Sequence, residues 1–242
     1  MTDRALKIGL CGFRLPLAEY VKRFDVVEVQ VTFYQPPQIA TLERWRQDAP
    51  DDFEFTVKAW QLITHESRSP TYRRLKQKLT EQEKDDVGAF RPTPIVKEAW
   101  ETTVACADAL RAKRILLQCP AKFTPTATHV ANFRRFVKAA SKKRKDLILL
   151  WEPRGEWPAP LVSELCTELN LIHVVDPLAS RSVTPDRYYR LQGRRGTDYS
   201  DEEFEELYEM LPTDRVSYVM FNMVYMVRDA ERFKRIVAGA RE

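Results

Sequence analysis

The chain has 242 residues, of which 44% are hydrophobic and 31% are charged, with a formal net charge of +4. This length suits one barrel domain and supplies a sizeable core. No apolar run approaches the roughly 18 residues that a membrane span needs, and residues 1–7 lack the layout of a signal peptide. We therefore expect a cytoplasmic protein with no membrane partner. Its mild positive charge suits an anionic ligand without requiring a nucleic acid.

Eight short apolar runs recur along the chain, with helix-like segments between them. The run at residues 147–151 is almost continuously apolar, which is typical of strands buried on both faces of a parallel sheet. Strict alternation of strands and helices, repeated eight times, predicts a closed α/β barrel of the (β/α)₈ TIM type spanning residues 1–242. An open doubly wound sheet is the alternative, but no glycine-rich dinucleotide turn follows the first run. The predicted strands are residues 7–12, 26–31, 54–57, 114–119, 147–152, 171–176, 188–193 and 216–222.

The third connection, from about residue 60 to residue 113, is far longer than the others. It contains a basic stretch at residues 72–76 and a predicted helix at residues 94–110 that should pack on the barrel. Connections of this length are usually functional lids or disordered segments. We expect a partly ordered flap over the mouth of the barrel.

Polar side chains stand near the ends of the predicted strands, on the face that should point into the barrel. In the second run Glu28, Gln30 and Thr32 alternate with valines, and the valines should meet the helices. A buried charge without a partner costs about 3–5 kcal/mol, so inward charges should form a network. Active sites of such barrels lie at the C-terminal ends of the strands. Salt bridges that merely join the strands are the alternative reading. The five predicted catalytic residues are Glu28, Lys58, Glu152, Asp176 and Arg190.

These residues lie in motifs that resemble the domain-of-unknown-function 72 family, also called YecE-like proteins. The motifs include VEVQVTFY at residues 27–34, ITH at 63–65, WEPR at 151–154 and YRLQG at 189–193, and they follow in family order on all eight strands. The resemblance implies a TIM barrel with a pocket at its C-terminal face, but no substrate. Its motif positions fall on Glu28, Thr32, Tyr34, Lys58, His65, Glu152, Arg154, Asp176 and Arg190.

Three positions depart from the family pattern. Gln30 replaces an asparagine, Gln192 replaces a histidine, and Met223 replaces a second asparagine. The loss of a histidine removes a candidate proton carrier. Strand position and resemblance together give the predicted substrate-binding residues Thr32, Tyr34, His65, Gln118, Arg154, Gln192, Gly193, Arg194, Arg195 and Asn222.

A candidate anion-binding loop follows the seventh strand, at Gly193-Arg194-Arg195-Gly196. In many barrels the loops after the last two strands hold phosphate. Glycines let backbone N–H groups approach an anion, and arginine binds phosphate through two parallel hydrogen bonds. A solvated turn is the alternative. We expect the ligand to be a small anionic or sugar-like molecule.

A metal ion is a possible but disfavoured cofactor, and no other cofactor is predicted. The histidines lack the close spacing of a metal site, and Lys58 and Arg190 would compete for the carboxylates. A Schiff base on Lys58 would need an amine of lowered pKa, and the neighbouring acids argue against one. The candidate metal ligands are Glu28, His65, Glu152 and Asp176.

Two functions of different class fit these observations. The first is an acid–base enzyme, a hydrolase or lyase, acting on a small phosphorylated or sugar-like substrate. Leu150 and Trp151 should raise the pKa of Glu152 and make it the general acid. Asp176 or Glu28 would act as base or charge partner, with the two cations stabilising negative charge. The second is a protein that binds nucleic acid or a nucleotide without catalysis. The sequence does not predict the oligomeric state.

Overall fold

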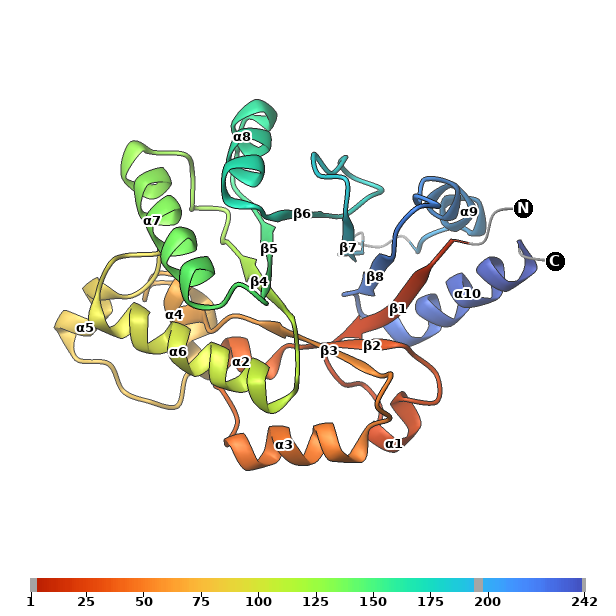
Figure 1. The fold of residues 1–242 in the computed structure, drawn as a ribbon, viewed down its shortest axis with the longest axis horizontal. Coiled ribbons are helices and arrows are strands. Elements are labelled where there is room, and N and C mark those ends of the chain that lie inside the picture. The colour runs from red at the N-terminus through yellow and green to blue at the C-terminus, as the bar shows by residue number, and fades with distance from the viewer. Residues whose placement is uncertain (1–3, 194–197, 241–242) are drawn as a thin grey trace.

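The structure, a computed structural model, describes residues 4–193 and 198–240. Eight parallel strands pair in chain order, and β8 closes on β1, which confirms the predicted TIM barrel (Figure 1). Short hydrophobic runs form the strands of the barrel wall, and these strands are buried on both faces, as in β4 and β5. The strands are β1 (Leu6–Cys11), β2 (Val26–Val29), β3 (Glu54–Lys58), β4 (Arg114–Gln118), β5 (Ile148–Glu152), β6 (Ile172–Val175), β7 (Arg187–Leu191) and β8 (Ser217–Phe221).

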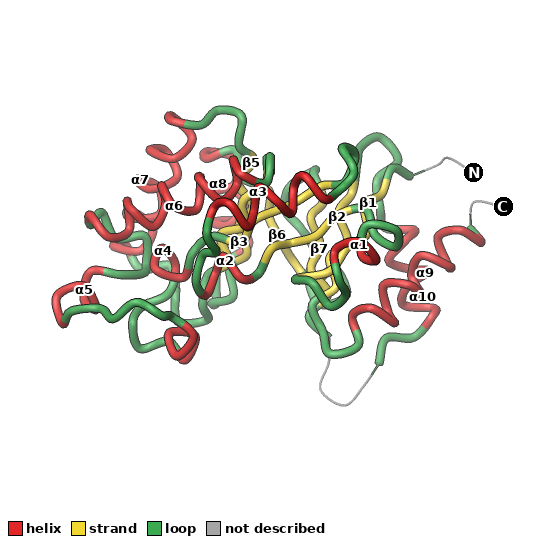
Figure 2. The backbone as a smooth tube through the Cα atoms, turned by 90° about the horizontal axis from the view of Figure 1, so that it is seen from below, coloured by secondary structure: helices red, strands yellow, loops and turns green. Residues whose placement is uncertain are grey.

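Helices surround the strands (Figure 2). The start of β1 lies on the same side as α9 and α10, and α4 to α7 gather on the opposite side (Figures 1 and 2). None of the helices in the described ranges is both long and apolar enough to cross a membrane. The helices are α1 (Leu17–Tyr20), α2 (Val31–Tyr34), α3 (Ile39–Asp48), α4 (Gln61–Thr64), the 3₁₀ turn η1 (Pro70–Arg74), α5 (Glu81–Asp86), α6 (Pro94–Ala109), α7 (Ala127–Lys143), α8 (Ala159–Leu169), α9 (Asp201–Glu209) and α10 (Met226–Gly239).

The strands divide their side chains between two apolar cores. One core lies inside the barrel and includes Leu116, Leu150 and Tyr188. The other lies between the barrel and its helices and includes Leu117 and Trp151. Because neighbouring strand residues point to opposite faces, this division fixes which polar side chains can point inward. The charges near the strand ends therefore rest on a packed apolar floor.

The second strand ends earlier than predicted. β2 stops at Val29, and residues 31–34 form the helical turn α2. The predicted strand parity, by which alternate residues of a strand point into the barrel, was therefore wrong for Thr32. The Thr32 hydroxyl donates to the carbonyl oxygens of Val29 and Lys58, each at 2.8 Å. These bonds hold the ends of β2 and β3 together in place of further strand pairing. The Thr32 hydroxyl is thus hydrogen-bonded to the backbone.

The long third connection is held down at several points. The α4 turn is wholly buried, and Gly88 N–H donates to Leu62 O at 2.7 Å. The Tyr72 hydroxyl donates to His65 O at 2.7 Å. The helix predicted at residues 94–110 is α6. The role of this connection as a flap over the barrel mouth stays a prediction.

Candidate functional site

Three of the five predicted catalytic residues meet inside the barrel as an ion trio of Glu28, Glu152 and Arg190. The Arg190 guanidinium lies 3.0 Å from Glu28 Oε1 and also donates to Glu152 Oε2. All three side chains are buried, and they come from β2, β7 and the last residue of β5. The Tyr188 hydroxyl donates to the other oxygen of Glu28 at 2.9 Å. Each of the two carboxylates therefore has the same cation, Arg190, as its buried partner.

Lys58 stands close to this trio but is bound differently. It is the last residue of β3, and its Nζ donates to Gln118 Oε1 at 2.8 Å. Its Nζ also lies 3.9 Å from the centre of the Phe33 ring, which the α2 turn places there. No carboxylate in the described part of the chain forms an ion pair with it. Lys58 is thus a buried amine held by an amide and an aromatic ring.

The surroundings of Lys58 lower its pKa to about 7. Burial is the largest cause, because it disfavours the charged ammonium, and the nearby Arg190 adds to it. Glu28 and Glu152 act in the opposite direction without cancelling the effect. Lys58 therefore changes its protonation state near neutral pH, which an ordinary lysine does not.

The predicted general acid, Glu152, has the opposite pKa shift from the one expected. Burial by itself would raise its pKa, but Arg190, Arg154 and Lys58 more than offset it and hold the pKa below its usual value. The prediction rested on the sequence neighbours Leu150 and Trp151, and was wrong because partners from other strands decide the outcome. Glu152 is a carboxylate at neutral pH, which leaves it without a proton to donate.

A polar rim, made of Gln30, Arg154, Gln192 and Asn222, lies above the ion trio and is partly exposed to solvent. Arg154 Nε donates to Glu152 Oε1 at 2.6 Å. Gln192 Oε1 accepts from Arg154 at 2.9 Å and from Asn222 at 2.8 Å, and Gln30 donates to Glu28. The amide at position 192 thus works as a hydrogen-bond acceptor that joins β7 to its neighbours. Gln192, which stands where the family pattern has a histidine, thus has hydrogen-bond partners of its own in this chain.

Asp176, the third predicted catalytic acid, binds backbone N–H groups instead of joining the ion trio. Its carboxylate accepts from the N–H groups of Leu178 at 3.1 Å and Gln192 at 2.9 Å, and from the Tyr199 hydroxyl at 3.2 Å. None of its hydrogen bonds within the described residues reaches the ion trio. Asp176 therefore fixes the loops that follow β6 and β7, because strand β6 has already ended at Val175.

His65 is buried near Lys58, and its Nδ1 lies 2.7 Å from Thr64 Oγ1. Burial, with a smaller contribution from Lys58 and Arg154, lowers its pKa to about 3. The imidazole is therefore neutral at physiological pH. Tyr34, the last residue of α2, is half-buried, and the Arg74 guanidinium lies 3.5 Å from its ring centre.

The predicted anion loop is only partly described. Gly193 has a φ of +77°, and a Cβ there would lie 2.7 Å from Met223 Cβ, so the chain needs glycine at this position. Arg194 and Arg195 lie outside the described residues. The anion-binding role of this loop stays a prediction.

The candidate metal ligands do not form a common site. Within residues 4–193 and 198–240, no three histidine, cysteine, aspartate or glutamate side chains are grouped so that they could hold a metal ion. Glu28 and Glu152 face Arg190, and Asp176 faces backbone N–H groups.

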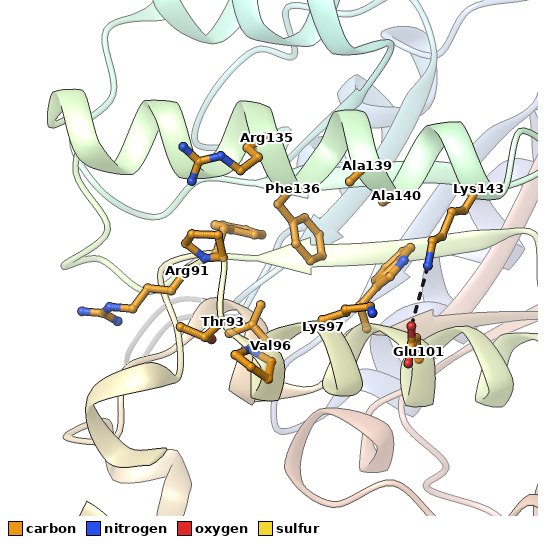
Figure 3. Close-up of a pocket in the computed structure, with 14 residues that line it drawn as sticks. Arg91, Thr93, Val96, Lys97, Glu101, Arg135, Phe136, Ala139, Ala140 and Lys143 are labelled. Atoms are coloured by element: carbon orange, nitrogen blue, oxygen red, sulfur yellow. Dashed lines mark ion pairs between the residues drawn. The ribbon is translucent and has the colours of Figure 1, made fainter. Parts of the chain in front are cut away.

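A separate groove of about 450 Å³ lies between α6 and α7 (Figure 3). Its apolar floor includes Trp100 and Phe136, whose ring centres are 5.4 Å apart, and Lys143 pairs with Glu101 at 3.7 Å across it. None of the predicted site residues lines this groove.

Three contributors to the site, Gln30, Phe33 and Tyr188, were not among the predicted site residues. Phe33 was hidden because its position depends on the α2 turn, which strand parity does not predict. Tyr188 shares an inward face with Arg190, so parity could have identified it. Its hydroxyl bridges Glu28 and Thr56, which lies 2.8 Å away.

Comparisons with known proteins identify the family by its model and the fold by solved structures. The model of the family described as "Protein of unknown function DUF72" matches residues 11–242, whereas no curated protein matches the chain. Among solved structures, a DUF72 family protein from Enterococcus faecalis V583 has a TM-score of 0.73 and 19% identity, covering 98% of this chain and 99% of that one. Another from Thermotoga maritima MSB8 has a TM-score of 0.64 and 20% identity, with 97% and 100% covered.

Endonuclease IV from Thermus thermophilus is also similar, with a TM-score of 0.52 and 10% identity over 97% of this chain and 99% of that one. At these identities the structural likeness shows the fold alone. The match to the family model over residues 11–242 does more: this chain belongs to the DUF72 family of proteins of unknown function.

Proposed function

We propose that this protein is an enzyme that moves protons on a small anionic, phosphorylated or sugar-like substrate at the C-terminal ends of the barrel strands. Lys58 takes the acid–base role that the sequence had suggested for Glu152. The observation that carries the proposal is the placement of Lys58: a buried amine whose partners are Gln118 and Phe33, beside carboxylates already paired with arginines.

The charges around Lys58 favour an anionic substrate. The ion trio sums to −1, and Arg154 brings the total to zero. Protonation of Lys58 therefore decides whether the site is neutral or positive. Arg154 is the cation nearest to solvent, with 39% of its side chain exposed. A substrate anion would meet Arg154 first, and the rim amides would bind its hydroxyl groups.

The pKa of Lys58 suits proton transfer at neutral pH. A catalytic acid or base works best when its pKa lies near the working pH, since both forms are then populated. With a pKa of about 7, Lys58 meets this condition, whereas Glu152 stays ionised and His65 stays neutral. The trio then supplies a fixed electrostatic field, and Lys58 supplies the mobile proton.

A screen in D₂O tests the proposed function. Sugar phosphates and polyhydroxylated carboxylates are incubated with the protein, and exchange of substrate C–H for C–D is followed by ¹H NMR. We expect exchange that depends on pH around 7 and falls by about 10²–10⁴ in Lys58→Met. The matched control is Lys138→Met, on the exposed face of α7, which should keep full activity. Equal rates in Lys58→Met and the parent protein would overturn the proposal.

Binding of nucleic acid or a nucleotide without chemistry stays the alternative prediction. Tight, salt-sensitive binding of an oligonucleotide, together with no exchange on any substrate of the panel, would favour it.

A further inference from the structure

The surroundings of Lys58 also suit a reaction of the amine itself. A lysine acts as a nucleophile only when its amine is neutral, and proteins achieve this by burying it among apolar groups or beside another cation. Lys58 has both features. Its side chain is 5% exposed, its Nζ lies against the Phe33 ring, and Arg190 is among its charged neighbours.

The neighbouring acids had argued against such chemistry, because a carboxylate pairing with Lys58 would keep it protonated. The structure removes this objection. Glu28 and Glu152 direct their oxygens to Arg190, Arg154, Tyr188 and Gln30. The hydrogen-bond acceptor of Lys58 is instead the neutral amide of Gln118. An amide oxygen fixes the direction of the amine without stabilising its charge as strongly as a carboxylate would.

We propose that Lys58 forms a Schiff base with a small anionic carbonyl compound, such as a 2-oxo acid or a phosphorylated aldehyde or ketone. This inference rests on the proposed function, since it names the substrate class of the same site. Four charged groups influence the pKa of Lys58: Arg190 and Arg154 lower it, and Glu28 and Glu152 raise it.

The step balances without any further reactant. The Nζ lone pair attacks the carbonyl carbon, and the C=O π electrons move to the oxygen. A proton passes from nitrogen to that oxygen and gives a carbinolamine. The hydroxyl group then leaves as water with a proton from solvent at the rim, and a C=N bond replaces the C=O bond. The protonated imine draws electrons from the adjacent C–H bond, which makes the proton transfer of the proposed function easier.

The anionic character of the ligand follows from Arg154. Its guanidinium lies above Glu152 with 39% of the side chain exposed, whereas Glu28, Glu152 and Arg190 are buried and paired with one another. A carboxylate or phosphate on the substrate would gain a charge-assisted hydrogen bond there. A neutral carbonyl compound of the same size would lack this contact and should bind more weakly.

Reductive trapping tests the inference with pyruvate as the probe. The full-length protein is incubated with pyruvate and sodium cyanoborohydride at pH 7, digested, and mapped by mass spectrometry. Near a pKa of 7 the neutral fraction of an amine exceeds that of an ordinary lysine by roughly a thousandfold. We therefore expect the reduced carboxyethyl adduct on Lys58 before the exposed Lys138, whose side chain is 61% exposed. Hydroxyacetone, a neutral probe of similar size, should label Lys58 more slowly.

The controls separate this inference from the proposed function. Lys58→Met should lose the fast adduct, and Lys138→Met should keep it. Labelling that follows solvent exposure, with Lys58 among the slowest lysines, would overturn the Schiff base. If Lys58→Met still abolished hydrogen exchange in that case, proton transfer by Lys58 would stand and only the covalent step would fall. Equal labelling by pyruvate and hydroxyacetone would overturn the anionic substrate class.

Discussion

Replacing Arg190 by methionine should lower the free energy of unfolding by about 3–5 kcal/mol, because the change leaves two buried carboxylates without their common cation. Glu28 and Glu152 both bind the Arg190 guanidinium, and Glu28 is wholly buried. Methionine fills a similar volume, so the loss reports on charge more than on packing. Urea unfolding of the parent and variant at pH 7 measures the difference.

Arg154→Met is the matched control for this prediction. Arg154 binds the same Glu152 carboxylate at 2.6 Å, but 39% of its own side chain is exposed to water, whereas that of Arg190 is buried. Exposed ion pairs contribute roughly 0–1 kcal/mol, so this variant should lose much less. A second variant, Arg190→Met with Glu28→Gln and Glu152→Gln, should regain part of the lost stability because no buried carboxylate is left without its cation. Equal losses in Arg190→Met and Arg154→Met would show that the trio does not hold the barrel together.

The stability of the protein should rise between pH 7 and about pH 10 relative to Lys58→Met. The folded protein gives Lys58 a pKa of about 7, and the ordinary value is 10.5. Below pH 7 both folded and unfolded chains carry the proton, so burial of the ammonium lowers stability by a constant amount. Between pH 7 and 10.5 only the unfolded chain keeps the proton. Stability therefore increases by about 1.4 kcal/mol per pH unit in that window.

Urea unfolding of both proteins at pH 6.5, 8 and 9.5 measures this difference. The lost hydrogen bond between Lys58 and Gln118 adds an offset, but that offset does not change the direction of the pH dependence. Other titrating groups are common to both proteins and cancel in the comparison. A difference between the two proteins that stays constant from pH 6.5 to 9.5 would mean that Lys58 keeps an ordinary pKa.

The barrel could be predicted from sequence because its signal is local and repeated. Runs such as residues 147–151 are apolar on both faces, and helical spacing follows them in each repeat. The ion trio could be predicted because strand parity alone decides whether Glu28 and Arg190 point inward. Burial then requires that opposite charges meet. No knowledge of the distances between strands was needed for this step.

The rest of the site depends on where each strand ends and on partners from other strands. Thr32 and Asp176 follow β2 and β6, so strand parity did not apply to them. The pKa of Glu152 is set by Arg190 and Arg154 rather than by the residues beside it in sequence. The neutral surroundings of Lys58 arise from Phe33 on α2 and Gln118 on β4, contacts that only the folded chain creates.

The titration of Lys58 itself is the decisive measurement for both roles proposed for this amine. The protein is produced with lysine labelled with ¹³C at Cε, and the Cε chemical shifts are followed by NMR from pH 5 to pH 11. The signal that disappears in Lys58→Met identifies Lys58. We expect a midpoint near pH 7 for this signal, with the exposed lysines titrating near their usual value of about 10.5. A Lys58 midpoint near 10 would contradict both roles, because the amine would then be neither a proton carrier nor a nucleophile at neutral pH.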